Sequence, residues 1–129
     1  MRLFSSNSFI PQLFLALISL LSITFPASVQ SSPLRCEIRD QPLIAIWCDV
    51  LENEIFLEDI SLNRGNCKSP KEHIQWILNS GGKDPQNNSY YPFDKKYIFG
   101  DKFWIHIFSC KTLEYSIRVN GSWWTWKIQ

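Results

Sequence analysis

The feature that most restricts the fold is Asn120-Gly121, an Asn-Gly pair near the end of the chain with an alternating run on each side. Both central residues of a type I′ turn need a positive φ, so this pair strongly predicts a β-hairpin over residues 113–129. A two-residue turn sets Val119 opposite Ser122 and thereby fixes every other pair. One face of the hairpin then carries an apolar stripe: Leu113, Tyr115, Ile117, Val119, Trp124, Trp126 and Ile128. A slip of one residue would break this stripe, so a largely β domain is expected.

The opposite face of the hairpin is polar apart from one tryptophan. Arg118 lies opposite Trp123 in this register, at a distance suited to a cation–π contact. Trp and Arg are common anchors of protein interfaces. We therefore expect Arg118 and Trp123 to form an exposed binding face, with the alternative that a loop such as residues 83–94 covers Trp123.

The start of the chain reads as a secretory signal peptide. Arg2 is followed by a mostly apolar run over residues 9–27, and small residues come after it. Cleavage is expected between Ser31 and Ser32, which predicts a signal peptide at 1–31 and a secreted or periplasmic protein. An uncleaved membrane anchor is the alternative, although the apolar run is short for a span of about 20 residues.

Residues 32–129 are enough for a single domain. The chain has 13 Lys and Arg against 12 Asp and Glu, and one of the basic residues, Arg2, lies in the signal peptide. The mature domain is therefore formally neutral. Neutrality argues against nucleic acid or an anionic membrane as the partner, because proteins that bind these carry a basic excess.

The four cysteines all lie in the mature domain. An even number in a small exported domain indicates disulfides, and no two of them have the spacing of a zinc knuckle. Neither a metal nor a cofactor is expected. If the first hairpin turns at Pro42, Cys36 lies opposite Cys48, which leaves Cys67 to pair with Cys110. Other connectivities remain possible from the sequence alone.

Further elements complete the expected fold. Residues 43–50 and 103–108 are apolar on both faces, which predicts two central strands and places Trp104 in the core. Adjacent charges at Glu58-Asp59 suggest a bulge. Ser69-Pro70 followed by Glu72 predicts a helix start, and Gly81-Gly82 its end. The fold class is mainly β: an antiparallel sandwich or half-open barrel with one short helix and two disulfides.

No group of residues has the pattern of a catalytic site. His106 lies in an apolar strand and His73 on the helix, and the sequence fixes no acid or nucleophile beside either one. Paired cysteines leave no nucleophilic thiol. No catalytic residue is assigned, and whether the protein is an enzyme stays open.

The sequence has more aromatic residues than a small core needs, and these suggest a binding surface. Tyr90 and Tyr91 lie in the polar segment 83–94 and join Arg118 and Trp123 as candidate binding residues. The leading hypothesis is an exported, non-catalytic protein that binds another exported protein, as an inhibitor or accessory factor. The alternatives are a carbohydrate-binding module, because aromatic rings stack on sugars, and a small secreted hydrolase or toxin.

The second half of the chain contains Asn-Arg-Gly-Asn-Cys at 63–67, Phe-Gly-Asp at 99–101 and a terminal Gly-Ser-Trp hairpin. In these motifs it resembles small exported bacterial proteins of unknown function. The resemblance implies export from a bacterial host and brings no catalytic residue with it. The residues alone do not fix the host, and in a eukaryote Asn87-Asn88-Ser89 would be a glycosylation acceptor.

Overall fold

The computed structural model describes residues 31–128, in which strands make up most of the regular structure. The elements are β1 (Leu34–Arg39), β2 (Ala45–Val50), β3 (Glu54–Leu62), η1 (Asn63–Gly65), α2 (Pro70–Ser80), η2 (Pro85–Asn87), β4 (Lys95–Ile98), β5 (Lys102–His106), β6 (Glu114–Val119) and β7 (Ser122–Lys127). The expected signal peptide lies outside the described residues, apart from Ser31. Within the described part of the chain, no helix combines the length and apolar character needed to cross a membrane.

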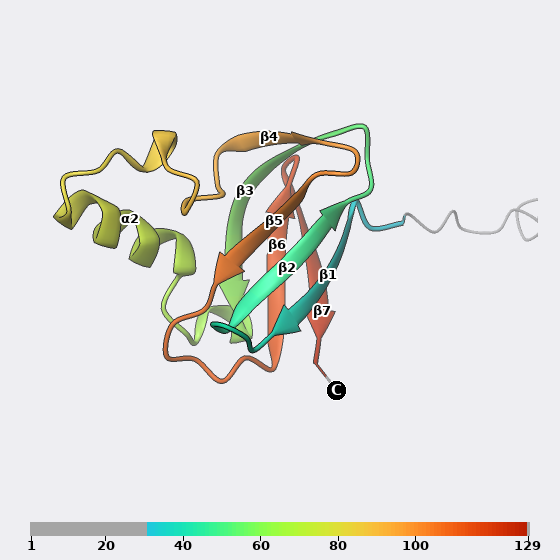
Figure 1. Cartoon of the computed structure of the whole chain (residues 1–129). Coiled ribbons are helices and arrows are strands. Elements are labelled where there is room, and N and C mark those ends of the chain that lie inside the picture. Colours follow the sequence, from blue (N-terminus) through green and yellow to red (C-terminus); the bar gives the residue numbers. More distant parts are fainter. Residues whose placement is uncertain (1–30, 129) are drawn as a thin grey trace, which may run out of the picture. The chain divides into compact units, whose positions relative to one another are not determined.

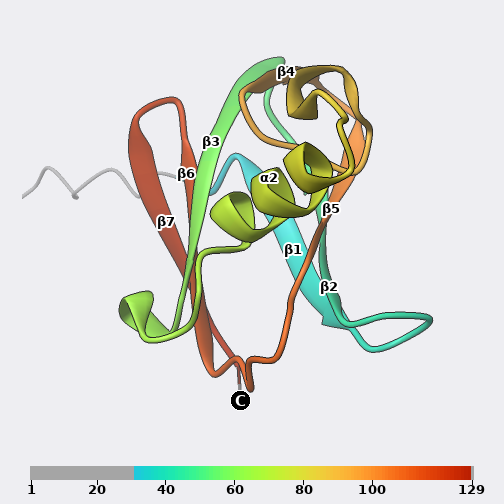
Figure 2. The same ribbon diagram turned by 90° about the vertical axis from the view of Figure 1, so that its left-hand side faces the viewer.

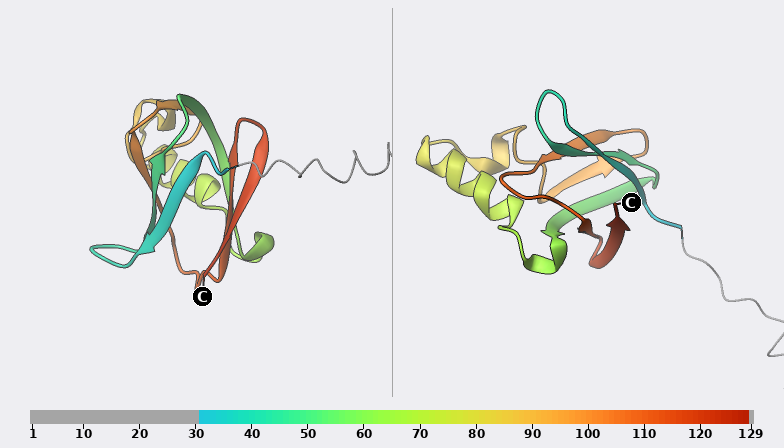
Figure 3. Two further views of the ribbon diagram at one scale, coloured as in Figure 1. Left: turned by 90° about the vertical axis from the view of Figure 1, so that its right-hand side faces the viewer. Right: turned by 90° about the horizontal axis from the view of Figure 1, so that it is seen from below.

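The strands form two antiparallel sheets that face each other. One has the order β1-β2-β5 and the other the order β4-β3-β6-β7 (Figure 1). Figure 2 shows the two layers, with α2 lying across the side of the sandwich between β3 and β5. On the opposite side, β1 and β7 are edge strands of their sheets (Figure 3). The expected antiparallel sandwich with one short helix is confirmed, and these strands do not close into a barrel.

The core fills the space between the sheets with side chains from alternate positions of each strand. A strand residue that points inward is followed by one that points outward, so burial alternates along β5 and β6. The largest fully buried side chains are Leu34, Ile46, Val50, Ile55, Leu57, Ile60, Leu62, Ile74, Tyr91, Phe93, Ile105 and Ile117.

The terminal hairpin has the expected register. Val119 pairs with Ser122 and Ile117 with Trp124, and the turn residues Asn120 and Gly121 have φ values of 51° and 80°. Tyr115, Ile117 and Val119 are buried, and Trp124 and Trp126 pack partly against the core. The expected stripe is too long by one pair. Leu113 and Ile128 are exposed because they lie beyond the ends of β6 and β7.

The first sheet confirms one expected central strand and corrects the other. β2 lies between β1 and β5, whereas β5 has β2 as its only neighbour in the sheet. Residues 103–108 therefore do not form a central strand. Phe103 and Ile105 point into the core, and Trp104 points outward with 40% of its surface exposed. The expected placement of Trp104 in the core is wrong. The apolar residues on one face of β5 pack in the core, and those on the other face lie at the surface.

The helix and the bulge follow the sequence signals. The Ser69 hydroxyl accepts a hydrogen bond from the backbone N–H of Glu72 at 3.3 Å, with Pro70 as the first helical residue. Ile74 and Leu78 point from α2 into the core. In β3 the pairing with β6 shifts between Leu57 and Asp59, which is the expected irregularity.

A turn after β3 ties that strand to the start of β6. Asn63 has a positive φ of 50°. Its Oδ1 accepts hydrogen bonds from the backbone N–H groups of Leu113 at 2.7 Å and Glu114 at 3.1 Å. Its Nδ2 donates to the carbonyl oxygen of Lys111 at 2.9 Å. The Asn-Arg-Gly-Asn-Cys motif thus begins with a structural clamp.

Both expected disulfides are present. Cys36 bonds to Cys48 across the β1–β2 pair, and Cys67 bonds to Cys110. The first closes a sequence separation of 12 residues and the second a separation of 43. The second therefore restricts the unfolded chain more strongly.

Replacing each disulfide by a pair of serines is expected to destabilise the protein unequally. From loop entropy, loss of Cys67–Cys110 should cost about 4 kcal/mol and loss of Cys36–Cys48 about 3 kcal/mol. Urea unfolding of the two double variants measures both values. An equal cost, or a larger cost for Cys36–Cys48, would contradict the loop-length argument.

Replacing Asn63 by alanine should cost about 2–4 kcal/mol, because the side-chain hydrogen bonds to the backbone of Lys111, Leu113 and Glu114 are lost and alanine disfavours a positive φ. Asn63→Gly is the matched control, since glycine accepts this φ but makes none of the side-chain bonds. Glycine should therefore be less damaging than alanine by about 1 kcal/mol in the same unfolding experiment. Equal losses would show that the backbone conformation contributes nothing.

Candidate functional site

The solvent side of the three-stranded sheet brings chemically distinct residues into three rows. Because Ile46, Cys48 and Ile105 point into the core, their neighbours along β2 and β5 point outward. We define the outer face as Arg35, Glu37 and Arg39 of β1, Ala45, Trp47 and Asp49 of β2, and Lys102, Trp104 and His106 of β5. The cross-strand register sets the rows as Arg35–Asp49–Lys102, Glu37–Trp47–Trp104 and Arg39–Ala45–His106.

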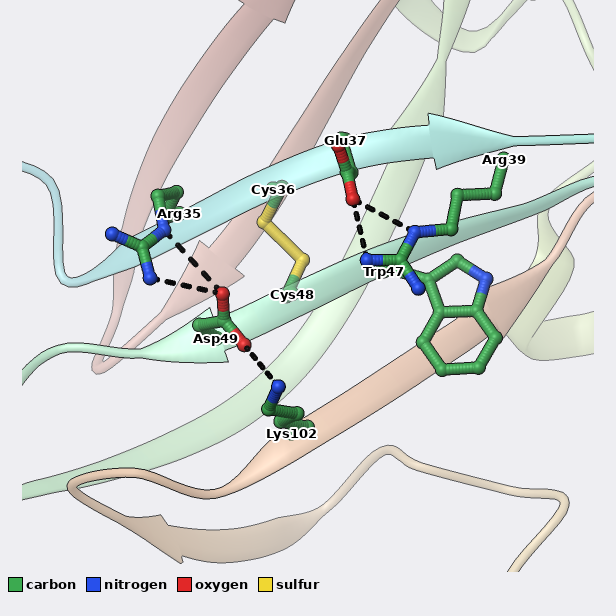
Figure 4. Close-up of a pocket in the computed structure, with 8 residues that line it drawn as sticks. All are labelled: Arg35, Cys36, Glu37, Arg39, Trp47, Cys48, Asp49 and Lys102. Atoms are coloured by element: carbon green, nitrogen blue, oxygen red, sulfur yellow. Dashed lines mark hydrogen bonds and ion pairs between the residues drawn. A yellow bond between two sulfur atoms is a disulfide. The ribbon is translucent and has the colours of Figure 1, made fainter.

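The first row is charged. Asp49 lies between two cations, with Oδ2 3.2 Å from Arg35 Nη2 and Oδ1 3.7 Å from Lys102 Nζ (Figure 4). One carboxylate thus serves two positive charges, which leaves this row with a cationic excess. Next to it, Arg39 Nε donates to Glu37 Oε1 at 2.7 Å. These residues line a cavity of about 250 Å³ together with Trp47 and the Cys36–Cys48 bond.

The second row is aromatic. The rings of Trp47 and Trp104 stack with their centroids 5.2 Å apart, and the Arg39 guanidinium lies 4.8 Å from the Trp47 centroid. Trp47 is therefore engaged by two neighbours, while Trp104 keeps a large exposed surface. The indole Nε1 of Trp47 is buried without a hydrogen-bond acceptor. A buried donor without an acceptor lowers the stability of the fold.

The loop between β1 and β2 extends the outer face with aliphatic residues. Leu43 is 61% exposed and lines a cavity with the two stacked tryptophans, and Ile44 beside it in the chain is 47% exposed. A second cavity, of about 220 Å³, lies between this loop and the rings. Its lining consists of Pro42, Leu43, Ala45, Trp47, Trp104 and His106. An apolar group of a partner fits the chemistry of this cavity.

The two histidines lie in aromatic surroundings. His106 stacks on Tyr90 with a centroid distance of 4.8 Å, and His73 stacks on Phe108 at 4.4 Å. Burial lowers the pKa of His106, so the fold favours its neutral form. His106 therefore acts as part of an aromatic cluster that includes Tyr90, at the end of the outer face.

Arg118 and Trp123 lie on the outside of the other sheet. They are cross-strand partners, as expected, and Trp123 is 48% exposed. The Arg118 guanidinium forms an ion pair with Glu58, with Nε 3.2 Å from Oε2. The charge expected over the Trp123 ring is thus held by a carboxylate of β3.

Tyr91 does not belong to a surface. Its side chain is fully buried, so the prediction that it contributes to a binding face is wrong. The hydroxyl donates to Asp94 Oδ2 at 2.8 Å and accepts from Gln75 Nε2 at 2.8 Å. Burial and the Asp94 carboxylate raise the pKa of Tyr91. Lys71 also pairs with Asp94 at 3.2 Å, so this cluster fastens α2 to residues 91–94.

Tyr90 remains half-buried against His106, and the four cysteines are consumed by the two disulfides. Among residues 31–128, no group of three His, Cys, Asp or Glu side chains is placed to hold a metal ion.

The binding residues that the sequence predicts do not include four residues of this site: Arg39, Leu43, Trp47 and Trp104. One signal for Trp47 was available, because a residue next to an inward-pointing Cys48 has to point outward. No comparable signal places Trp104 beside Trp47. That contact depends on the pairing of β2 with β5, which are more than 50 residues apart in the chain.

Comparison of the chain with protein-family models, with curated proteins and with solved structures gives no match in any of the three. The resemblance to small exported bacterial proteins therefore stays a prediction.

The neutral state of His106 predicts a pH-dependent stability. A folded-state pKa below the unfolded value of about 6.5 means that the unfolded chain binds the proton more readily. The contribution of His106 is therefore complete above about pH 6.5 and is lost as the pH falls below it. In urea unfolding, the stability difference between the wild type and His106→Gln should shrink from about pH 7.5 to about pH 5. A difference that stays constant or grows would contradict this assignment.

Proposed function

We propose that this chain is an exported, non-catalytic binding protein that recognises another protein through the outer face and the adjoining Leu43–Ile44 loop. The observation that carries the proposal is the Trp47–Trp104 stack with Arg39 beside it and exposed aliphatic residues at its border. An inhibitor or accessory factor is the kind of protein that fits this surface.

The chemistry of the outer face is that of a protein interface. Tryptophan and arginine are enriched at the residues that dominate binding energy, and such residues are commonly surrounded by a polar rim. Here Trp104 and Leu43 provide exposed apolar area, and the Arg35–Asp49–Lys102 row provides a charged border. The Cys36–Cys48 disulfide joins two strands of the sheet that presents these groups, which lowers the entropy cost of binding.

The same geometry favours a protein over a sugar. A sugar site needs a free aromatic face with polar side chains around it, and one of the two stacked rings, Trp47, is already engaged by Arg39 and Trp104. The cavity between the loop and the rings is lined without a carboxylate or an amide side chain. The carbohydrate-binding module thus remains the second hypothesis, and the hydrolase or toxin the third.

Export is supported by the cysteines. All four are paired, and disulfides of this kind persist in oxidising compartments such as the periplasm or the extracellular space. Together with the sequence of residues 1–31, this supports a secreted or periplasmic location.

A photo-crosslinking residue placed at position 43, which borders the two tryptophans, should capture the partner from the exported fraction of the native host. The test is the affinity of the captured protein, measured after its purification. Trp104→Ala should weaken binding by about 30-fold, the loss of about 2 kcal/mol that is typical of a dominant interface residue. The change should raise the dissociation rate more than it lowers the association rate.

Trp123→Ala is the matched control, since Trp123 is an exposed tryptophan on the other sheet. It should leave the affinity within about twofold, because it lies away from the outer face. A large effect of Trp123→Ala with no effect of Trp104→Ala would move the binding surface to the Arg118–Trp123 face. Binding of purified polysaccharides that Trp104→Ala abolishes would favour the carbohydrate-binding module.

A further inference from the structure

β5 exposes one edge of the three-stranded sheet to a possible fourth strand. Its pairing with β2 includes hydrogen bonds from Val50 N–H to the Asp101 carbonyl and from Ile107 N–H to the Ile44 carbonyl. In an antiparallel pair the backbone groups of alternate residues point to opposite sides. The odd-numbered residues of β5 therefore pair with β2. The N–H and C=O groups of Lys102, Trp104 and His106 point away from it.

A cavity of about 280 Å³ lies beside this free edge. On one side it is bounded by β5, and on the other by residues of β4 and the segment before it. Its lining is Ser89, Pro92, Lys95, Tyr97, Lys102, Phe103 and Trp104. In Figure 1, β5 lies between β4 and β2, so the cavity is on the side that β2 leaves free.

The charged groups that line this cavity are both cationic. Lys95 Nζ donates to the carbonyl oxygens of Asn88 at 2.9 Å and Tyr91 at 2.6 Å, which carry no formal charge. Lys102 is mostly exposed and shares Asp49 with Arg35. An occupant with a carboxylate would complement this charge, and one with an ammonium group would be repelled.

From these observations we infer that the partner enters this cavity as a short extended segment with acidic side chains and adds to β5 as a fourth strand. Strand addition uses the free backbone groups for affinity and the bordering side chains for specificity. The free backbone donors and acceptors of Lys102 and Trp104 would supply the affinity. The side chains of Lys95 and Lys102 would select acidic side chains. The inference rests on the proposed function, because Trp104 belongs both to the outer face and to this cavity.

The length of the segment is limited by the structure. Of the outward-paired residues of β5, Lys102 and Trp104 line the cavity, whereas His106 does not line it and stacks on Tyr90. The occupant is therefore a short stretch of extended chain. Lys102 also opposes pairing between two copies of this edge, because the two ammonium groups would meet.

The test uses the ¹⁵N-labelled, disulfide-bonded protein and three capped peptides of equal length: acetyl-VEVEVE-amide, acetyl-VKVKVK-amide and an acidic analogue methylated at every second backbone nitrogen. The acidic peptide should shift the amide resonances of residues 102–104. When the free peptide concentration is twice the Kd, about one third of the protein is unbound. Hydrogen exchange at the Lys102 and Trp104 amides should then slow by about threefold, because these amides exchange only in the unbound protein. The methylated analogue should bind about tenfold more weakly, because it cannot pair with the free edge.

Lys102→Glu should reverse the preference between the acidic and the lysine peptide. Lys127→Glu is its matched control, an exposed lysine on β7 in the other sheet, and should leave the preference unchanged.

Absence of binding at millimolar peptide, resonance shifts confined to β7, or equal binding of the methylated analogue would each overturn strand addition. If Trp104→Ala still weakens the protein partner in that case, the proposed function survives. If the peptide binds as expected but Trp104→Ala has no effect on the partner, the outer face is the part that fails.

Discussion

The alternation of side chains along each strand is the constraint from which the rest of this structure follows. The two sheets can only cover each other if Ile46, Cys48 and Phe103 point inward, and the Cys36–Cys48 bond locks that orientation at the β1–β2 pair. Every residue between them is then forced outward. Trp47 and Trp104 meet on the outer face as a consequence of how the core is filled. A change that turned the inward-pointing side chains of β2 outward would lose both the core and the aromatic stack.

The edges of the two sheets determine which backbone groups are left for an added strand. Among residues 31–128 the first sheet has three strands, so β5 is its end strand there and leaves backbone groups without a partner among these residues. The chain after η2 passes beside that edge, because the Tyr91–Asp94 cluster fastens it to α2. A buried hydrogen-bonded cluster on the helix therefore determines the wall of a surface cavity. This links the interior of the domain to the site at which a partner would add a strand.

Local signals in the sequence predicted the elements that depend on neighbouring residues. Asn120-Gly121 gave the register of β6 and β7, Ser69-Pro70 gave the start of α2, and Pro42 placed Cys36 opposite Cys48. The errors concern contacts between distant segments. The apolar run of β5 does not reveal that one of its faces is solvent, and the polar segment around Tyr91 conceals a core residue whose hydroxyl finds two partners. The candidate site was missed for the same reason, since it exists only once β5 pairs with β2.

The two outer surfaces of the sandwich differ in how their charged side chains are paired. On the four-stranded sheet, Arg118 of β6 pairs with Glu58 and Lys96 of β4 pairs with Glu54, one carboxylate to each cation. On the three-stranded sheet, Asp49 is shared by Arg35 and Lys102, and Lys95 of β4 lines the cavity beside the β5 edge. A formally neutral domain thus carries a local cationic border beside its exposed Trp104. Exposed apolar surface and positive charge therefore lie together at β5, which is the combination that the proposed acidic extended segment requires.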